Sequence, residues 1–166
     1  NRIILKRLLA ITVSIAAMSC ATANACDGAL DDVTSDVGTH DGFYYNFWKQ
    51  TVEDNVRISC GDGGNFSANW SNVFNWIGGK GWNPGGPRVV SYSGTFNSEE
   101  AQDSQNAYLT LYGWTTDPLI EYYVVESYGT YNPKNCGHGR YFGSFQSDGA
   151  TYDLRECQIV SLGRDT

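Results

Sequence analysis

The chain has 166 residues, enough for one domain with a substantial core, and 18 acidic against 11 basic side chains give it a net charge of −7. A nucleic-acid partner requires a basic face, and so does an anionic membrane surface, so this charge argues against both. Charged residues make up only 17% of the chain although aromatic residues reach 14%, so flat rings are unusually prominent among the side chains available for recognition.

Residues 1–25 have the pattern of a secretory signal peptide. Basic residues precede an apolar run from Leu8 to Ala17, and the small-residue pattern Ala23-Asn24-Ala25 follows. The apolar run is short for a bilayer span. We therefore expect cleavage after Ala25, a mature chain that begins near Cys26, and secretion to the outside of the cell. Lipid attachment at Cys20 is the alternative.

Removal of the signal peptide leaves four cysteines, which in an exported domain suggest two disulfides. Cys136 and Cys157 flank a predicted hairpin around residues 147–149, so we expect these two to pair and Cys26 to pair with Cys60. A metal site is the alternative, but the chain has no C-x-x-C motif and only two histidines. No metal or cofactor is expected.

The mature chain begins with an acidic arm, residues 26–41, that lacks periodicity. Beyond it, alternating or β-branched and aromatic segments predict strands. Residues 75–81 begin apolar and end glycine-rich, residues 82–87 form a loop, and residues 97–106 form a polar turn. The predicted strands are 42–48, 66–71, 89–96, 108–114, 119–127, 141–145 and 150–156. Short strands with glycine-rich turns and no amphipathic helix indicate an all-β sandwich or jelly roll.

Residues 108–114 and 119–127 are predicted to form a β-hairpin around the turn residues 115–118. A four-residue loop would pair Trp114 with Leu119 and Tyr112 with Glu121. Alternate residues share a face, so Tyr112, Glu121 and Tyr123 would form one patch. A phenol beside a carboxylate can donate a hydrogen bond to its ionised form.

Glu121 allows two interpretations. It can be a solvated residue on an exposed strand face, as many glutamates are. Its aromatic surroundings favour a second interpretation, because rings around a carboxylate suit sugars: C–H bonds pack on the ring and hydroxyls find polar partners. The hairpin alone does not decide between them.

The segment 118–128, PLIEYYVVESY, resembles the nucleophile signature of glycoside hydrolase family 11, the small endo-β-1,4-xylanases. Further matching motifs follow the family's order and extend the resemblance from Gly42 to Gln158. They are Gly42-Phe43-Tyr44-Tyr45, Asn69-Trp70-Ser71-Asn72, residues 78–82, residues 92–96, residues 108–114, residues 129–133 and Ser147-Asp148-Gly149.

The resemblance implies a jelly-roll β-sandwich of two twisted antiparallel sheets around a xylan cleft, acting with retention of configuration. It implies that Glu121 is the nucleophile, that Tyr112 hydrogen-bonds to it and that Tyr123 contacts the adjacent sugar. The remaining implied site residues are Trp48, which would stack on a xylose ring, Trp114 on the cleft floor, and Asn75, which would neighbour the acid/base and tune its pKa.

A second catalytic carboxyl is missing from the pattern. Glu126 lies on the strand of Glu121 with opposite parity, and the family's late Glu-Gly-Tyr motif, thumb loop and helix are not present. An arginine is expected where Ile159 stands. We expect a partial catalytic domain over residues 42–158 that is incomplete at its C-terminus, a non-family tail over 159–166, and a chain that is inactive and poorly stable because of a partial or frame-shifted reading.

Three functions are compatible with these patterns. The first is an endo-xylanase with xylan or xylo-oligosaccharides as its partner, acting as a monomer. The second is a non-catalytic carbohydrate-binding sandwich, which the incomplete catalytic pair favours. The third is a structural secreted β-protein without catalytic relevance.

Overall fold

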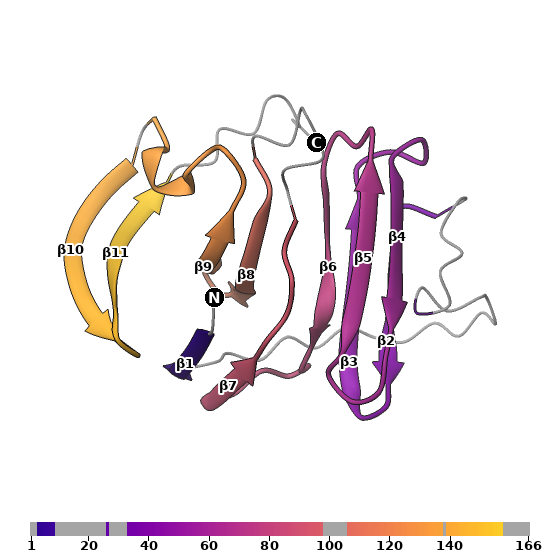
Figure 1. Ribbon diagram of the computed structural model, residues 1–166, viewed down its shortest axis with the longest axis horizontal. Helices are drawn as coiled ribbons and strands as arrows, with labels where there is room; N and C mark the ends of the chain where they lie inside the picture. Colours follow the sequence, from indigo (N-terminus) through magenta and orange to yellow (C-terminus); the bar gives the residue numbers. More distant parts are fainter. Residues whose placement is uncertain (1–2, 9–25, 27–32, 98–105, 138, 158–166) are drawn as a thin grey trace. The chain divides into compact units, whose positions relative to one another are not determined.

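The computed structural model describes residues 3–8, 26, 33–97, 106–137 and 139–157, and these form mainly antiparallel β-structure (Figure 1). Within this part of the chain the only helical element is a 3-10 turn, η1 (Pro133–Asn135), and no helix is long and apolar enough to cross a membrane. The predicted all-β class with antiparallel sheets is confirmed. The chain divides into two compact units, each of which we describe by itself.

The β2–β6 unit, residues 10–86, contains a three-stranded sheet of order β2-β3-β6 and a two-stranded sheet of β4 and β5. The predicted strands near residues 42–48 and 66–71 are confirmed. The strand β2 lies within the range expected to be an N-terminal arm, and β4 and β6 are additional strands. The bounds are β2 (Ser35–His40), β3 (Phe43–Lys49), β4 (Asn55–Cys60), β5 (Phe66–Ser71) and β6 (Trp76–Gly81).

Alternate residues of β3 and β4 face a common core, as the two-residue period of a strand requires. Tyr45, Phe47, Val56 and Ile58 are buried there together with Cys26. Further partly buried residues of both sheets pack against this cluster. The other face of β3, which carries Trp48, is therefore turned away from the core.

The close approach of Tyr45 to the backbone requires a glycine in β2. The Tyr45 hydroxyl donates a hydrogen bond to Asp36 Oδ2 across 3.1 Å. To reach it, the phenol ring crosses Gly38, where an added Cβ would lie 2.6 Å from the Tyr45 hydroxyl oxygen. A side chain at position 38 would therefore displace a core residue.

The β7–β11 unit, residues 1–9 and 87–166, consists of three antiparallel strand pairs. The pairs are β1 (Ile3–Leu8) with β7 (Arg88–Tyr92), β8 (Tyr108–Thr116) with β9 (Leu119–Tyr128), and β10 (Gly139–Ser147) with β11 (Ala150–Cys157). The predicted strand 89–96 ends early, at Tyr92. Most of the expected signal peptide and most of the polar turn 97–106 lie outside the described residues, so the signal peptide stays a prediction.

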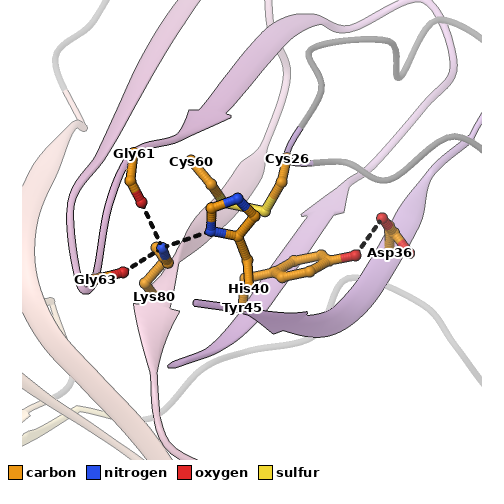
Figure 2. Close-up of a disulfide and its surroundings, with 8 residues drawn as sticks. All are labelled: Cys26, Asp36, His40, Tyr45, Cys60, Gly61, Gly63 and Lys80. Carbon is orange, nitrogen blue, oxygen red and sulfur yellow. Dashed lines mark hydrogen bonds between the residues drawn. A yellow bond between two sulfur atoms is a disulfide. The ribbon is translucent and has the colours of Figure 1, made fainter. Parts of the chain in front are cut away.

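Both expected disulfides are present. Cys136 bonds to Cys157 with Cα atoms 6.0 Å apart, and Cys26 bonds to Cys60 with Cα atoms 4.7 Å apart. Figure 2 shows that the Lys80 ammonium group lies near the second disulfide, where it donates hydrogen bonds to the carbonyl oxygens of Gly61 (2.9 Å) and Gly63. The loop between β4 and β5 is therefore held by a disulfide and by a half-buried ammonium group.

Candidate active site

The β8–β9 hairpin closes through a two-residue loop, Asp117-Pro118. Thr116 pairs with Leu119, and Trp114 pairs with Glu121. The expected four-residue loop, with Tyr112 opposite Glu121 and Trp114 opposite Leu119, is therefore wrong. The shift is two residues along one strand, and a shift of two leaves every side chain on its predicted face.

Four residues on one face of this hairpin form what we call the hairpin patch: Tyr112, Trp114, Glu121 and Tyr123. The Glu121 side chain is exposed, and its Oε2 accepts a hydrogen bond from the Tyr123 hydroxyl across 2.6 Å. The Tyr112 ring centroid lies 5.0 Å from that of Tyr123 and 5.6 Å from that of Trp114. The patch is thus one accessible carboxylate surrounded by three touching rings.

The two phenols of the hairpin patch are held in their protonated form. Burial and the charge of Glu121, together with a hydrogen bond to it, raise the pKa of Tyr112 to about 12. Burial, the hydrogen bond to Glu121 and its charge raise the pKa of Tyr123 well above its ordinary value. Both hydroxyls therefore stay available as hydrogen-bond donors to Glu121 across the physiological pH range.

In the β2–β6 unit, Trp48 and Asn75 lie on the same face of the sheet. Trp48 pairs directly with Ile77 on β6, and Asn75 precedes Ile77 by two residues. The Gln50 amide donates a hydrogen bond of 2.9 Å to the Asn75 carbonyl, which continues the β3–β6 ladder by one residue pair. Alternate residues of a strand share a face, so Asn75 is a diagonal neighbour of Trp48 and faces away from the core.

The structure therefore brings the expected site residues together in two groups, one in each unit. Glu121, Tyr112, Trp114 and Tyr123 form the hairpin patch, and Trp48 and Asn75 form the second group. Two charged side chains near Asn75 were not indicated by any pattern, namely Lys49 and Asp54, which are 2% and 4% exposed. A charged residue beside a turn is ordinarily solvated, so the sequence carries no signal for their burial.

Glu126, the nearest other carboxyl on β9, is engaged elsewhere. It lies where the β8–β9 pairing is interrupted, and both its oxygens lie 3.0 Å from the Tyr152 hydroxyl on β11. Burial raises the pKa of Glu126, and the charge of Asp148 raises it further against the opposing effect of the Tyr152 hydrogen bond. Asp117 lies in the loop between β8 and β9, and Glu156 lies near the end of β11. Three further carboxyls, those of Glu99, Glu100 and Asp103, lie outside the described residues.

No group of three or more histidine, cysteine, aspartate or glutamate side chains that could hold a metal ion occurs in the described part of the chain. The chemistry that this arrangement offers is that of an accessible carboxylate with tyrosine donors. Such a carboxylate can act as a nucleophile toward an electrophilic carbon of a molecule that packs against the rings.

Comparison with known proteins matches residues 40–162 to the family described as Glycosyl hydrolases family 11. An endo-1,4-beta-xylanase Xyn11B of Cellvibrio japonicus is 48% identical over 153 residues, which cover 91% of this chain and 41% of that protein. A bifunctional xylanase/xylan deacetylase of the same organism is 53% identical over 130 residues, covering 77% of this chain and 19% of that protein. An endo-1,4-beta-xylanase 11A of Humicola insolens is 44% identical over 151 residues, covering 91% and 65%. The chain thus spans less than two thirds of the length of each.

Proposed function

This chain belongs to the glycosyl hydrolases family 11, whose jelly-roll β-sandwich it shares, and we propose that the protein hydrolyses internal β-1,4-xylosidic bonds in xylan. The observation that carries the proposal is the hairpin patch, in which the carboxylate of Glu121 is exposed among rings and hydrogen-bonded by Tyr123. The names of the relatives, which are xylanases, support the choice of xylan as substrate.

The proposed mechanism is a double displacement with retention of configuration. Glu121 attacks the anomeric carbon, the glycosidic C–O bond breaks, and a glycosyl-enzyme ester forms. An acid/base carboxyl protonates the departing oxygen and then takes a proton from the water that cleaves the ester. Tyr112 and Tyr123 orient Glu121, and Trp114 and Trp48 provide rings against which xylose units stack.

The acid/base carboxyl would have to lie about 5–5.5 Å from Glu121 in a retaining enzyme. Glu126 is hydrogen-bonded by Tyr152, and we assign the acid/base role to none of the carboxyls within the described residues. We propose that the described residues alone are inactive on xylan, that the acid/base carboxyl of the whole protein lies outside them, and that Asn75 lies beside that carboxyl.

The second candidate function is a non-catalytic carbohydrate-binding sandwich. The feature that favours it is again the single carboxyl of the hairpin patch, since rings alone suffice to bind a sugar chain. Either protein is proposed to be a secreted monomer.

A reactive xyloside with a dinitrophenolate leaving group separates the two candidates, because such a group departs without protonation and needs no acid. A 2-fluoro derivative slows hydrolysis of the ester, so a nucleophilic Glu121 would be trapped as a covalent adduct that peptide mass spectrometry locates. We expect the adduct on Glu121 and none with Glu121→Gln. If the chain binds xylan in an affinity gel but forms no adduct, it is a binding module; if it does neither, both proposals fail.

A further inference from the structure

Two buried charged side chains lie at the end of β3 and belong to neither group of site residues. Lys49 is 2% exposed and Asp54 is 4% exposed. Burial of an ionised group is costly unless hydrogen bonds replace its water. The hydrogen-bond partners of Lys49 and Asp54 therefore indicate which parts of the chain these two residues hold in place.

The Asp54 carboxylate accepts hydrogen bonds from backbone amides of two separate segments. Its Oδ2 accepts a hydrogen bond of 3.0 Å from the Thr51 amide in the same turn, and its Oδ1 accepts one of 2.6 Å from the Phe74 amide ahead of β6. Burial raises the pKa of Asp54, but the hydrogen bonds from these backbone amides outweigh it and hold the pKa below its ordinary value. Asp54 is thus an ionised bridge between the β3–β4 turn and the segment before β6.

Lys49 fixes the turn that presents this carboxylate. Its ammonium group donates hydrogen bonds to the carbonyl oxygens of Val52, at 2.9 Å, and of Asp54 itself, at 3.0 Å. The turn is therefore tied from inside by a side chain of β3, and Asp54 has little freedom to move relative to that strand.

The segment before β6 is anchored by Val73, which packs against the core, and by backbone hydrogen bonds. The Phe74 side chain is 80% exposed, so apolar burial of this ring does not hold the chain in place. The Phe74 amide is bonded to Asp54, and the Asn75 carbonyl accepts the Gln50 amide across 2.9 Å. Beyond Val73, backbone hydrogen bonds thus hold the chain around Asn75, and one of them ends on the buried Asp54 carboxylate, a charged acceptor.

We propose that Asp54, held by Lys49, is a positioning residue that fixes Asn75 beside Trp48 on the sugar-facing side of the β2–β6 unit. The assignment rests on the proposed function in one respect, namely that Asn75 and Trp48 belong to the xylan-binding site. A residue whose backbone is already fixed loses less conformational entropy when its side chain binds a sugar hydroxyl. Asp54 acts only through the backbone and does not itself touch the substrate.

Amide hydrogen exchange tests the positioning directly. In Asp54→Asn the charge is lost and only one oxygen can still accept, so the hydrogen bond from Phe74 is either lost or no longer assisted by charge, and we expect the Phe74 amide to exchange about tenfold faster or more. The amides of Ile58 and Trp70, in the β4–β5 sheet, should keep their protection. Lys49→Met, which keeps the apolar stem, should speed exchange at Phe74 as well. Unchanged protection of Phe74 in both variants would overturn the proposal, and so would an equal loss at every amide.

Titration with xylohexaose, followed by tryptophan fluorescence, tests the consequence for binding. We expect Asp54→Asn and Asn75→Ala each to weaken binding by about threefold to tenfold, and the double variant to be no weaker than Asn75→Ala alone. Asp36→Asn, which removes a carboxylate bonded to Tyr45 in the same unit, is the matched control and should bind normally. Additive losses would overturn the positioning role. If the unaltered chain binds no oligosaccharide, the proposed function fails, while the exchange result still decides whether Asp54 holds Asn75.

Discussion

Tyr123 donates its hydroxyl hydrogen bond to Oε2 of Glu121 across 2.6 Å, and one residue separates the two on the same face of β9. This distance is typical of a hydrogen bond from a hydroxyl to an ionised carboxylate. The Tyr112 ring, from the neighbouring strand, has its centroid 5.0 Å from that of Tyr123, and burial together with the charge of Glu121 raises the pKa of the Tyr112 hydroxyl. The orientation of the candidate nucleophile therefore depends on two phenols that the hairpin itself supplies.

Tyr123→Phe is expected to slow covalent labelling of Glu121 by the activated fluoro-xyloside by about tenfold or more. The variant keeps the ring and its contact with Tyr112 but removes a hydrogen bond to a charged group. Labelling rates measured by intact-protein mass spectrometry check the result. Tyr141→Phe is the matched control, because the Tyr141 hydroxyl contacts Ser144 on β10 at 2.6 Å. Equal rates in the two variants would show that Tyr123 does not orient Glu121.

From the contact between Glu126 and Tyr152 we expect the thermal stability of the chain to depend on pH. Burial raises the pKa of Glu126, so the folded state favours its neutral form. The stabilisation that comes from this preference for the neutral carboxyl is complete below the ordinary pKa of 4.5. It is lost as the pH rises through the higher pKa that Glu126 has in the folded state. Glu126→Gln keeps a neutral side chain at every pH. We therefore expect its melting temperature to match that of the unaltered chain near pH 4 and to exceed it near pH 7.

A second substitution checks the cause of this difference. The Tyr152 hydrogen bond lowers the pKa of Glu126, so Tyr152→Phe should destabilise the chain more at pH 7 than at pH 4. In the background of Glu126→Gln that difference between the two pH values should disappear. Thermal unfolding followed by circular dichroism at both values measures it. A melting-temperature difference that is the same at both pH values contradicts the assignment.

The faces of the hairpin were predictable, whereas its register was not. Alternation along residues 108–114 and 119–127 determines which side chains share a face, because the period of a strand is two. The pairing of Trp114 with Glu121 depends instead on the length of the loop. A four-residue loop and a two-residue loop at Asp117-Pro118 give different cross-strand pairs but leave each side chain on the same face of the hairpin. The sequence therefore predicts the members of the hairpin patch correctly but pairs them wrongly.

The grouping of Trp48 with Asn75 depends on long-range pairing that local patterns do not contain. Those patterns place each residue on or beside a strand, but only the β3–β6 ladder makes them neighbours. The alternation of Val56, Ile58 and Cys60 in β4 was a readable strand signal. Burial of Lys49 and Asp54 was not readable, since it follows from tertiary contacts with backbone groups rather than from residue type.

Gly38→Ala is expected to destabilise the chain by about 1–3 kcal/mol, the usual cost of inserting a methyl group into a packed region. The new Cβ would lie 2.6 Å from the hydroxyl oxygen of the buried Tyr45 side chain. Gly81→Ala is the matched control in the same sheet, because a Cβ at Gly81 meets nothing within 4 Å. Urea unfolding measures both free energies. Equal stability of the two variants would mean that the packing of the Tyr45 side chain does not require a glycine at position 38.

Removal of the Cys136–Cys157 disulfide by a double substitution to serine is expected to lower the free energy of unfolding by about 3 kcal/mol. The bond closes a loop with a sequence separation of 21, and the stabilisation in the chain-entropy treatment grows only slowly with loop length. Loss of the Cys26–Cys60 bond, with a separation of 34, should therefore cost slightly more. Urea unfolding of the two double variants, each with the other disulfide intact, makes the comparison. If the loss of Cys136–Cys157 has no effect, the β10–β11 hairpin is held at its open end by its strand pairing alone, since Gly139 pairs with Cys157 there.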